Sequence, residues 1–568
     1  MESAAFRRSH IARTGIDGPG EDPSGDRVSR AARQPTAPLP GSITRWLLSA
    51  GADDDIALVE PAGPVSYRKL RAMVAAMAGR LRAAGLPDGA RVGVLGSNSA
   101  FWVSCYLAAM TRWVAVPLAE RMTPGQTRDQ IHFAGCRALC VDARHRASHA
   151  DALSGIVIVT EQDLAEAVAD PGRAGAKFTG AECTGAGLTA WTADRDRDAV
   201  VVFTSGTTAR PKAVRITHRN LWANTRSIVA CLQIRRDDRM LVVLPFHYCF
   251  GASLLHTHLR AGASLVLCTS FAFPQTAVNL IEARQCTALA GVPSSFQLLL
   301  RASDFAAHQL PSLRKIQQAG GRLPEAQLRE LMRAQPQSQL FVMYGQTEAT
   351  ARLSVLPPER LADKLGSIGR GIPGVDLEIL DERGRRVGPA VVGEIYASGA
   401  NVSPGYLDDP VASADKFPGG RLRTGDLARM DEEGFIYIVD RRDDFIKSWG
   451  RRVSSLEIEN CALQMPGILE AAAIGVPDDA AGEAIELFLV PGPAGPLTEA
   501  RGRGPAGPLT DAQVQGFLRE RLPKYMLPRR IHWVPALPMN VNGKVSKASL
   551  RQRATEPDGA PMPMETTT

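Results

Sequence analysis

The stretch that decides the fold is Ala199–Lys212, which reads AVVVFTSGTTARPK. Its first half, Val200–Phe203, is a run of β-branched and aromatic residues, which is typical of a buried strand. Its second half, Thr204–Lys212, holds four hydroxyl side chains, one glycine and a terminal lysine. Small residues let backbone N–H groups approach an anion, the hydroxyls add donors, and the lysine adds charge. The segment therefore predicts a polyphosphate site at the end of a strand, although its spacing is not that of a Walker A loop.

The composition excludes several classes of protein. The chain has 568 residues, of which 45% are hydrophobic and 22% charged, as in globular proteins with one large core and a smaller one. A net charge of +7, without a dense basic block, argues against nucleic-acid binding. No apolar run reaches the 18 or more residues of a membrane span. Nine scattered cysteines, an odd number, predict reduced thiols and a cytoplasmic location.

On both sides of Ala199–Lys212, short apolar runs alternate with helical patterns. Apolar residues spaced as on one helix face predict helices at Lys69–Ala84, at Ala100–Met110 and after Thr217. The predicted strands are Val92–Leu95, Val114–Leu118, Ala138–Val141, Val157–Val159, Met240–Leu244, Ser264–Leu267, Ala288–Gly291 and Leu340–Met343. This alternation predicts parallel α/β sheets that bind ligands at the carboxyl ends of their strands.

The last third of the chain has a different pattern. Val375–Leu380 and Gly393–Tyr396, with a turn at Asp381–Gly384, predict antiparallel strands. After Asp440 the predicted elements are strands at Ala471–Val476 and Ala484–Val490 and a helix at Asp511–Leu522. The sequence GPAGPLT occurs twice between these elements, which predicts a surface loop. The expected divisions are a disordered leader (1–40), an N-terminal domain (41–440), a C-terminal domain (441–556) with a flexible insert (491–510), and a disordered tail (557–568).

The segment TSGTTARPK resembles the phosphate-loop signature TSGTTGxPK of the adenylate-forming superfamily, which includes acyl-CoA synthetases, peptide-synthetase adenylation domains and beetle luciferases. One residue departs from that signature, because Ala209 stands where the family usually has glycine. If the position requires a positive φ, an alanine costs roughly 1 kcal/mol. The departure therefore implies slower turnover at most.

Further motifs resemble those of the family and occur in its order over residues 41–556. Tyr344–Glu348, YGQTE, is similar to YGxTE, which implies that Tyr344 stacks on adenine, that Thr347 reaches the α-phosphate and that Glu348 binds Mg²⁺ together with Thr208. Gln318–Gly321 resembles the segment over the adenine and beside the acyl pocket. The residues implied to contact ATP or AMP are Thr204, Ser205, Gly206, Thr207, Thr208, Lys212, Ala319, Gly320, Tyr344, Gly345, Gln346, Thr347, Asp426, Arg441 and Lys544.

Four C-terminal segments extend the resemblance. Arg423–Asp426 matches RTGD, in which the aspartate accepts hydrogen bonds from the ribose hydroxyls. Asp440–Asp444 resembles the GRxDD hinge, with Arg441 at the ribose and phosphate, Asp443 as pivot, and Asp440 in place of glycine, which bears on the ease of rotation. Gly450 follows in the block that borders the thiol channel. Asn542–Val545 matches NGKV, which places Lys544 between the substrate carboxylate and the α-phosphate.

The acyl pocket is expected around Pro245–Tyr248, which resembles the family's P-x-H aromatic segment. By this resemblance His247, Tyr248 and Gln318 line the pocket. The residues implied in catalysis are Lys212, His247, Thr347, Glu348 and Lys544. Adenylation domains for α-amino acids carry an aspartate near Cys249, and this chain has none there. The expected substrate is therefore an acid without an α-amino group.

The resemblance implies an α/β enzyme with a large N-terminal domain of parallel sheets, a β-barrel-like subdomain and a small, mobile α+β C-terminal domain. Its implied activity is ATP-dependent ligation of a small carboxylic acid to a thiol through acyl-AMP, with Mg²⁺, and with CoA as acceptor. One alternative is an enzyme that loads a separate phosphopantetheinyl carrier protein, and a less favoured one is a luciferase-like oxygenase. A non-catalytic nucleotide sensor, suggested by Ala209 and Asp440, conflicts with the joint retention of Lys212, Glu348, Asp426 and Lys544. The identity of the acid and the oligomeric state stay open.

Overall fold

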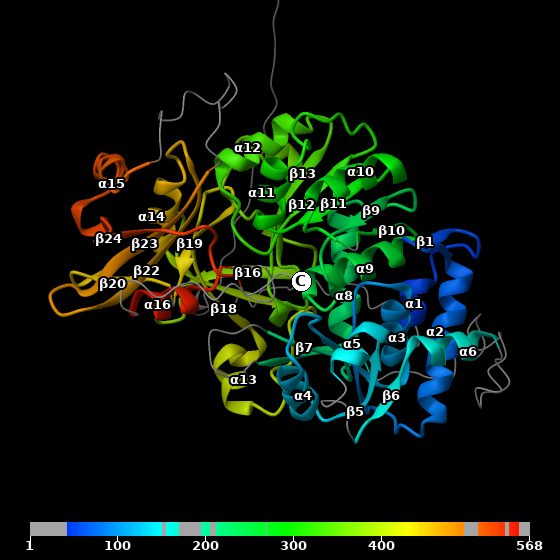
Figure 1. The fold of residues 1–568 in the computed structure, drawn as a ribbon. Coiled ribbons are helices and arrows are strands. Elements are labelled where there is room, and N and C mark those ends of the chain that lie inside the picture. The colour runs from blue at the N-terminus through cyan, green and yellow to red at the C-terminus, as the bar shows by residue number, and fades with distance from the viewer. Residues whose placement is uncertain are drawn as a thin grey trace, which may run out of the picture. The chain divides into compact units, whose positions relative to one another are not determined.

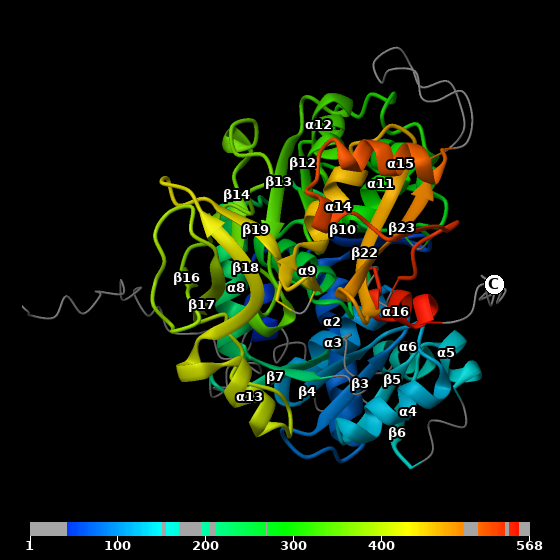
Figure 2. The same cartoon turned by 90° about the vertical axis from the view of Figure 1, so that its left-hand side faces the viewer.

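We describe the fold from a computed structural model, shown in Figures 1 and 2. The residues that the structure describes are 43–149, 155–169, 195–204, 212–268, 270–442, 444–492, 509–539 and 545–555. The predicted leader (1–40), most of the insert (491–510) and the predicted tail (557–568) lie outside these ranges. No helix within the ranges is both long enough and apolar enough to cross a lipid bilayer.

A six-stranded sheet contains the strand that precedes the predicted phosphate loop. Its order is β6-β5-β3-β4-β7-β8, and all neighbouring pairs are parallel except β7–β8. Its strands are β3 (Arg91–Leu95), β4 (Val114–Leu118), β5 (Cys136–Val141), β6 (Val157–Val159), β7 (Asp198–Phe203) and β8 (Ala213–Thr217). The five predicted strands of this region are confirmed, whereas β8 was not predicted.

A nine-stranded sheet contains the YGQTE motif. Its order is β15-β14-β13-β12-β11-β9-β10-β1-β2, with parallel pairing from β13 to β1 and antiparallel pairing at both edges. Its strands are β1 (Ile56–Glu60), β2 (Gly63–Ser66), β9 (Arg239–Val242), β10 (Ser264–Leu267), β11 (Ala288–Gly291), β12 (Lys315–Gln318), β13 (Gln339–Tyr344), β14 (Ser354–Leu356) and β15 (Arg370–Gly371). The strand predicted at Met240–Leu244 ends two residues early.

Two helices that are buried on all sides pack against these sheets. α3 (Ala100–Arg112) contacts β3 and β4 of the six-stranded sheet, and α9 (Cys249–Ala261) contacts β9 and β10 of the nine-stranded sheet. Such helices belong to the interior of a large core, since neither presents a polar face. Helix α1 (Ile43–Leu48) contacts both of them. Residues from both sheets therefore belong to one hydrophobic core.

The remaining helices of the N-terminal region begin at polar caps in several cases. Ser66, Ser99 and Thr217 accept hydrogen bonds from the backbone three residues ahead, and thereby fix the first turns of α2, α3 and α8. The other helices are α2 (Tyr67–Ala83), α4 (Pro124–Phe133), α5 (Ala143–Ser148), α6 (Glu161–Ala169), α8 (His218–Cys231), α10 (Pro274–Arg284), α11 (Pro293–Ala302), α12 (Glu325–Ala334) and α13 (Pro410–Lys416).

Two smaller sheets follow. The antiparallel order β16-β17-β18-β19 comprises β16 (Val375–Leu380), β17 (Gly393–Gly399), β18 (Leu422–Met430) and β19 (Ile436–Arg441). The predicted turn is present, because Gly384 N donates to Asp381 O at 2.9 Å. The C-terminal sheet comprises β20 (Ile446–Ser448), β21 (Arg451–Val453), β22 (Ile468–Asp478), β23 (Gly482–Pro491) and β24 (Arg530–Trp533). Its long strands β22 and β23 are labelled in Figure 2. Its helices are α14 (Ser455–Ala462), α15 (Asp511–Arg519) and α16 (Lys547–Thr555), and α15 ends three residues before the prediction.

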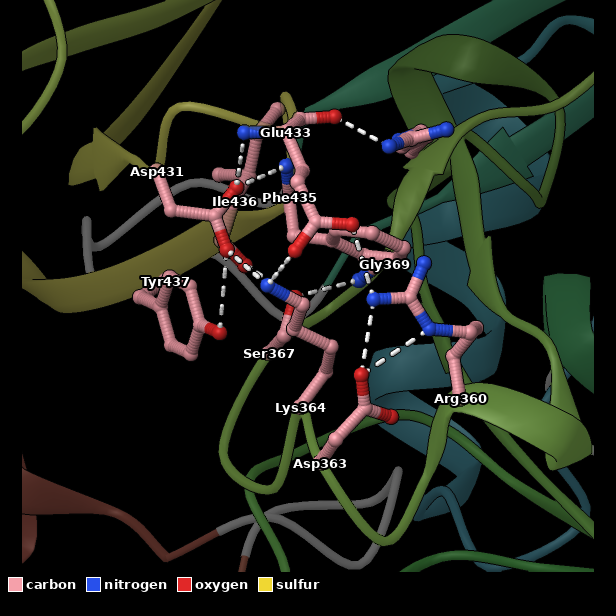
Figure 3. Close-up of polar contacts among 11 residues, drawn as sticks. Arg360, Asp363, Lys364, Ser367, Gly369, Asp431, Glu433, Phe435, Ile436 and Tyr437 are labelled. Atoms are coloured by element: carbon pink, nitrogen blue, oxygen red, sulfur yellow. Dashed lines mark hydrogen bonds and ion pairs between the residues drawn. The ribbon is translucent and has the colours of Figure 1, made fainter.

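A charged network holds the β18–β19 turn against the segment that precedes β15 (Figure 3). Lys364 Nζ lies 2.9 Å from Asp431 Oδ2 and 2.5 Å from Glu433 Oε1, and Arg360 Nη2 lies 2.9 Å from Glu433 Oε2. Both cations also lie over the Phe435 ring, at 4.7 Å (Arg360) and 5.1 Å (Lys364) from its centroid. The network therefore fixes one end of the hairpin whose strands carry the RTGD motif and the start of the hinge motif.

Candidate active site

The predicted phosphate loop is the connection of a β-hairpin. Thr204 N and Thr204 Oγ1 both donate to Lys212 O, at 2.8 and 3.3 Å, and so close the base of the loop. Strands β7 and β8 on either side are antiparallel, so the loop is not followed directly by a helix. Ser205, Gly206, Thr207, Thr208 and the divergent Ala209 lie outside the described residues. Their contribution to a phosphate site therefore stays a prediction.

A tyrosine joins the end of the phosphate loop to the predicted magnesium ligand. Lys212 Nζ lies 5.0 Å from the centroid of the Tyr406 ring, within the range of a cation–π interaction. The Tyr406 hydroxyl donates to Glu348 Oε1 at 2.9 Å. Burial and the Glu348 charge raise the pKa of Tyr406, so its hydroxyl stays a donor at neutral pH. The structure thus brings Lys212 and Glu348 to the same tyrosine, with Lys212 at its ring and Glu348 at its hydroxyl.

Tyr406 was not identified from the sequence. The only feature of the neighbouring sequence that could indicate it is the glycine directly before it, Gly405, which has a φ of 143° in the structure. Its function as a link depends on pairing with β8 through the Val214–Tyr406 bridge, which connects segments far apart in the chain.

Three motifs meet at the carboxylate of Asp426. Tyr344 Oη donates to Asp426 Oδ2 at 2.5 Å, and Arg441 Nε donates to Asp426 Oδ1 at 3.1 Å. The register of β18 and β19 places Asp426 directly opposite Arg441, while Tyr344 is the last residue of β13. Burial and the Asp426 charge raise the pKa of Tyr344, and Asp426 also raises the pKa of Arg441. The residues predicted to contact adenine, ribose and phosphate therefore meet at one carboxylate. Tyr344 lies 82 positions from Asp426 in the chain, and Arg441 lies 15 positions from it.

The segment predicted to lie over the adenine follows β12. Gln318 Nε2 donates to Gly321 O at 2.7 Å, which fixes the turn. Gly320 has a φ of 84°, and a Cβ there would lie 2.7 Å from Val292 Cγ1 and 3.3 Å from Tyr248 Oη. Both the conformation and the space therefore require glycine. The buried Ala319 precedes it, so Ala319 and Gly320 lie near Tyr248, and their roles at the nucleotide and acyl sites stay predictions.

His247 and the YGQTE loop approach the start of α9. Thr347 Oγ1 donates to Cys249 Sγ at 3.4 Å. His247 Nε2 is enclosed and has no hydrogen-bond partner among the described residues. Burial, with a smaller contribution from the Arg121 charge, lowers the pKa of His247 to about 4, so the imidazole is neutral at neutral pH. A Cβ on Gly345 would lie 1.8 Å from Ala351 O, which explains the glycine of the motif.

A cavity of about 20 Å³ lies beside α9. Four of its lining residues, Cys249, Ala252, Ser253 and His256, have the spacing of one helix face. Tyr106 closes one side, and its hydroxyl lies 3.1 Å from His256 Nε2. The other lining residues are Val200, Val202, Ile216, Leu221, Asn224, Thr225, Ile228, Thr350 and Ala351. No acidic side chain is among them, and the sequence analysis identified none of this lining.

The C-terminal motifs are only partly described. Asp443 and Lys544 lie outside the described residues, so their predicted roles are untested. Gly450, with a φ of 71°, ends the turn after the exposed Trp449. Asp440, the residue that replaces glycine, is buried, and its Oδ2 accepts from Ser455 Oγ and from Leu456 N, both at 3.4 Å. Asp440 therefore accepts from the first turn of α14, whose N-cap is Ser454.

Lys547, which opens α16, lies three positions after Lys544. Its Nζ lies 2.6 Å from Ser455 Oγ and 2.9 Å from Glu459 Oε1, and both partners belong to α14. Burial raises the pKa of Glu459, whereas the Glu459 charge contributes to a raised pKa of Lys547. These contacts of Lys547 hold the start of α16 against α14.

Comparisons with known proteins agree with this geometry. The sequence model described as "AMP-binding enzyme" matches residues 48–407, and the one described as "AMP-binding enzyme C-terminal domain" matches residues 457–544. A 2-succinylbenzoate–CoA ligase of Bacillus pumilus is 30% identical over 513 residues, which are 89% of this chain and 97% of the relative. A feruloyl-CoA synthase of an Amycolatopsis species is 30% identical over 86% of this chain and 94% of the relative.

Two solved structures match the fold over most of this chain. ATP-bound MatB from Rhodopseudomonas palustris matches with a TM-score of 0.79 and 27% identity, over 91% of this chain and 99% of that one. The o-succinylbenzoate CoA synthetase MenE of Bacillus subtilis, in complex with its acyl-adenylate intermediate, matches with a TM-score of 0.77 and 26% identity over the same shares. The chain therefore belongs to the adenylate-forming superfamily of AMP-binding enzymes, as an AMP-forming acid–thiol ligase of the acyl-CoA synthetase type.

Proposed function

We propose that this enzyme converts a carboxylic acid without an α-amino group into its CoA thioester through an acyl-AMP intermediate. The observation that carries the proposal is the meeting of Tyr344 and Arg441 at the Asp426 carboxylate. Asp426 is buried and accepts hydrogen bonds at both oxygens, so a nucleotide ribose that replaces these donors would be held in the same way. The named activities of the relatives, which are CoA ligases and synthetases, support the reaction class.

In the first half-reaction, a carboxylate oxygen of the acid attacks the α-phosphorus of ATP, and the bond to pyrophosphate breaks. Lys212, Thr204 and the loop between them would hold the phosphates, while Thr347 and Lys544 would stabilise charge at the α-phosphate. Glu348 and Thr208 would bind Mg²⁺, which neutralises phosphate charge when bound. A related CoA synthetase has been solved with ATP and a magnesium ion, which supports both groups here.

In the second half-reaction, a thiol sulfur attacks the acyl carbon and AMP leaves with the bonding electron pair. We propose that the region after Asp440 rotates between the halves about Asp443, which withdraws Lys544 and brings Gly450 to the thiol. The buried neutral His247 beside the acyl site can orient the substrate without adding charge. We assign residues 41–440 and 441–556 to the two moving parts, and the cytoplasm as the compartment.

ATP–pyrophosphate exchange tests the proposal. The enzyme is assayed with fatty, aryl, short-chain and amino acids, with and without CoA. Exchange with one class of acid, together with CoA-dependent release of AMP, is the expected result. The Asp426→Asn variant should show a raised KM for ATP, because a neutral amide accepts at one atom only. Absence of exchange with every acid would contradict the proposal.

The acceptor thiol is tested separately. If CoA does not accelerate the release of AMP, and a phosphopantetheinyl carrier protein gains the mass of the acyl group, the acceptor is a carrier protein and not CoA. Light emission or oxygen consumption with the acyl-AMP would instead indicate the oxygenase.

A further inference from the structure

Arg352 is a buried cation beside the acyl site. Only 2% of the residue is exposed, and its guanidinium carbon lies 4.7 Å from the centroid of the Phe250 ring on α9. It follows Thr350 and Ala351, which line the cavity next to α9. Its backbone N donates to Asn224 Oδ1 at 3.1 Å, and its backbone O accepts from Asn224 Nδ2 at 2.8 Å. The carboxamide of Asn224 therefore fixes the backbone of Arg352 at both its N–H and its carbonyl.

The guanidinium has no carboxylate partner among the residues that the structure describes. Its Nε makes no hydrogen bond there, although the atom is fully enclosed. Lys315, a second buried cation of this domain, is different, because its Nζ lies 2.7 Å from Asp238 Oδ2 and donates to Gln233 O at 2.7 Å. Buried charges in proteins are normally paired, since an unpaired one loses its hydration without compensation.

The side chain nevertheless keeps its charge. Burial lowers the pKa of Arg352 to about 10, which leaves the guanidinium protonated at neutral pH. Stacking on the phenyl ring of Phe250 compensates only part of the lost hydration, because a ring quadrupole attracts a cation more weakly than a carboxylate does. An anion that reaches this position would therefore be bound strongly.

The surroundings of Arg352 are those of the acyl site. Phe250, on whose ring Arg352 lies, follows directly after Tyr248 and Cys249 at the start of α9. Cys249 also lines the cavity and accepts a hydrogen bond from Thr347, the residue predicted at the α-phosphate. The first turn of α9 therefore contacts Thr347 through Cys249 and the buried guanidinium through Phe250.

We propose that Arg352 binds a second carboxylate of the acyl substrate, and that the enzyme forms thioesters of dicarboxylic acids. This inference rests on the proposed function and names its substrate class. A guanidinium presents two parallel N–H donors that match a carboxylate, and the pairing is strong where water is excluded. One carboxylate of the acid would then be adenylated while Arg352 holds the other.

The first experiment needs no variant. Pyrophosphate exchange is measured with matched pairs of acids, each a dicarboxylic acid and its monomethyl ester, over short aliphatic and aryl chains. We expect kcat/KM for the accepted diacid to exceed that of its monoester by about 10- to 100-fold, the range for a hydrogen-bonded charge. Equal or greater kcat/KM for the monoester or for simple monocarboxylic acids would overturn the inference and leave the proposed function intact. Absence of exchange with every acid would overturn both.

The second experiment assigns the preference to Arg352. In Arg352→Met, the ratio of kcat/KM for the diacid to kcat/KM for its monoester should fall to about 1, while KM for ATP stays unchanged. Arg352→Lys should retain part of the ratio, since a lysine supplies charge without the planar fork. The control is Arg360→Met, which removes another arginine at 4.7 Å from a phenyl ring, but one already paired with Glu433. The control should keep the ratio. A preference for diacids that persists in Arg352→Met would refute the role of this residue.

Discussion

The link through Tyr406 gives a sharp test of how the site is held together. The Tyr406→Phe change removes the hydroxyl that donates to Glu348 at 2.9 Å, but keeps the ring that lies 5.0 Å from Lys212. A hydrogen bond to a charged group contributes about 1.5–3 kcal/mol. If about half of that energy orients Glu348 for the metal, kcat/KM falls by roughly 3- to 10-fold. The Tyr406→Leu change also removes the ring and should add a further loss of about 0.5–1 kcal/mol.

The assay is pyrophosphate exchange as a function of Mg²⁺ concentration. Because Tyr406 acts through Glu348, the Mg²⁺ concentration for half-maximal rate should rise in Tyr406→Phe, whereas KM for the acid stays the same. Tyr437→Phe is the matched control, since its hydroxyl lies 3.4 Å from a carboxylate oxygen of Asp431 in the charged network. If the Mg²⁺ concentration for half-maximal rate is the same in Tyr406→Phe as in Tyr437→Phe and the unchanged enzyme, Tyr406 does not orient Glu348 for the metal.

Two further predictions follow from the structure, and a third follows from the sequence motif that contains Lys544. Lys315→Met leaves the buried Asp238 without its closest cation, so the free energy of unfolding should fall by about 3 kcal/mol in urea titrations, and an unchanged midpoint would contradict this. Hydrogen bonding between His145 and Asp142 raises the pKa of the histidine above 6.5 and lowers that of the aspartate below 3.8. The ion pair therefore stabilises the fold most between about pH 4 and 6.5, and the stability deficit of His145→Gln should shrink as the pH rises through the folded-state pKa of His145. Lys544→Ala should abolish adenylation yet spare thioester formation from supplied acyl-AMP, and retained adenylation would contradict the assigned role.

Most of the central parallel strands and the positions of the nucleotide motifs could be predicted from the sequence, whereas β1, β2, β8 and β12 could not. Continuous apolar runs such as Val200–Phe203 have no alternative to burial on both faces, so their strand structure follows from composition alone. Turn chemistry and caps are equally local, as at Asp381–Gly384 and Thr217. The strand predicted at Leu340–Met343 is likewise present, and it extends by one residue at each end in β13.

Only the tertiary structure decided how charge and space are distributed around the site. Strand β12, KIQQ, was missed because its polar side chains are buried, and Lys315 tolerates burial only through Asp238 on a distant segment. Tyr406 links Lys212 to Glu348, and Arg352 lies against Phe250, through contacts that no local pattern encodes. The physical reason is that these interactions depend on distance in space, whereas propensity and periodicity describe neighbours along the chain.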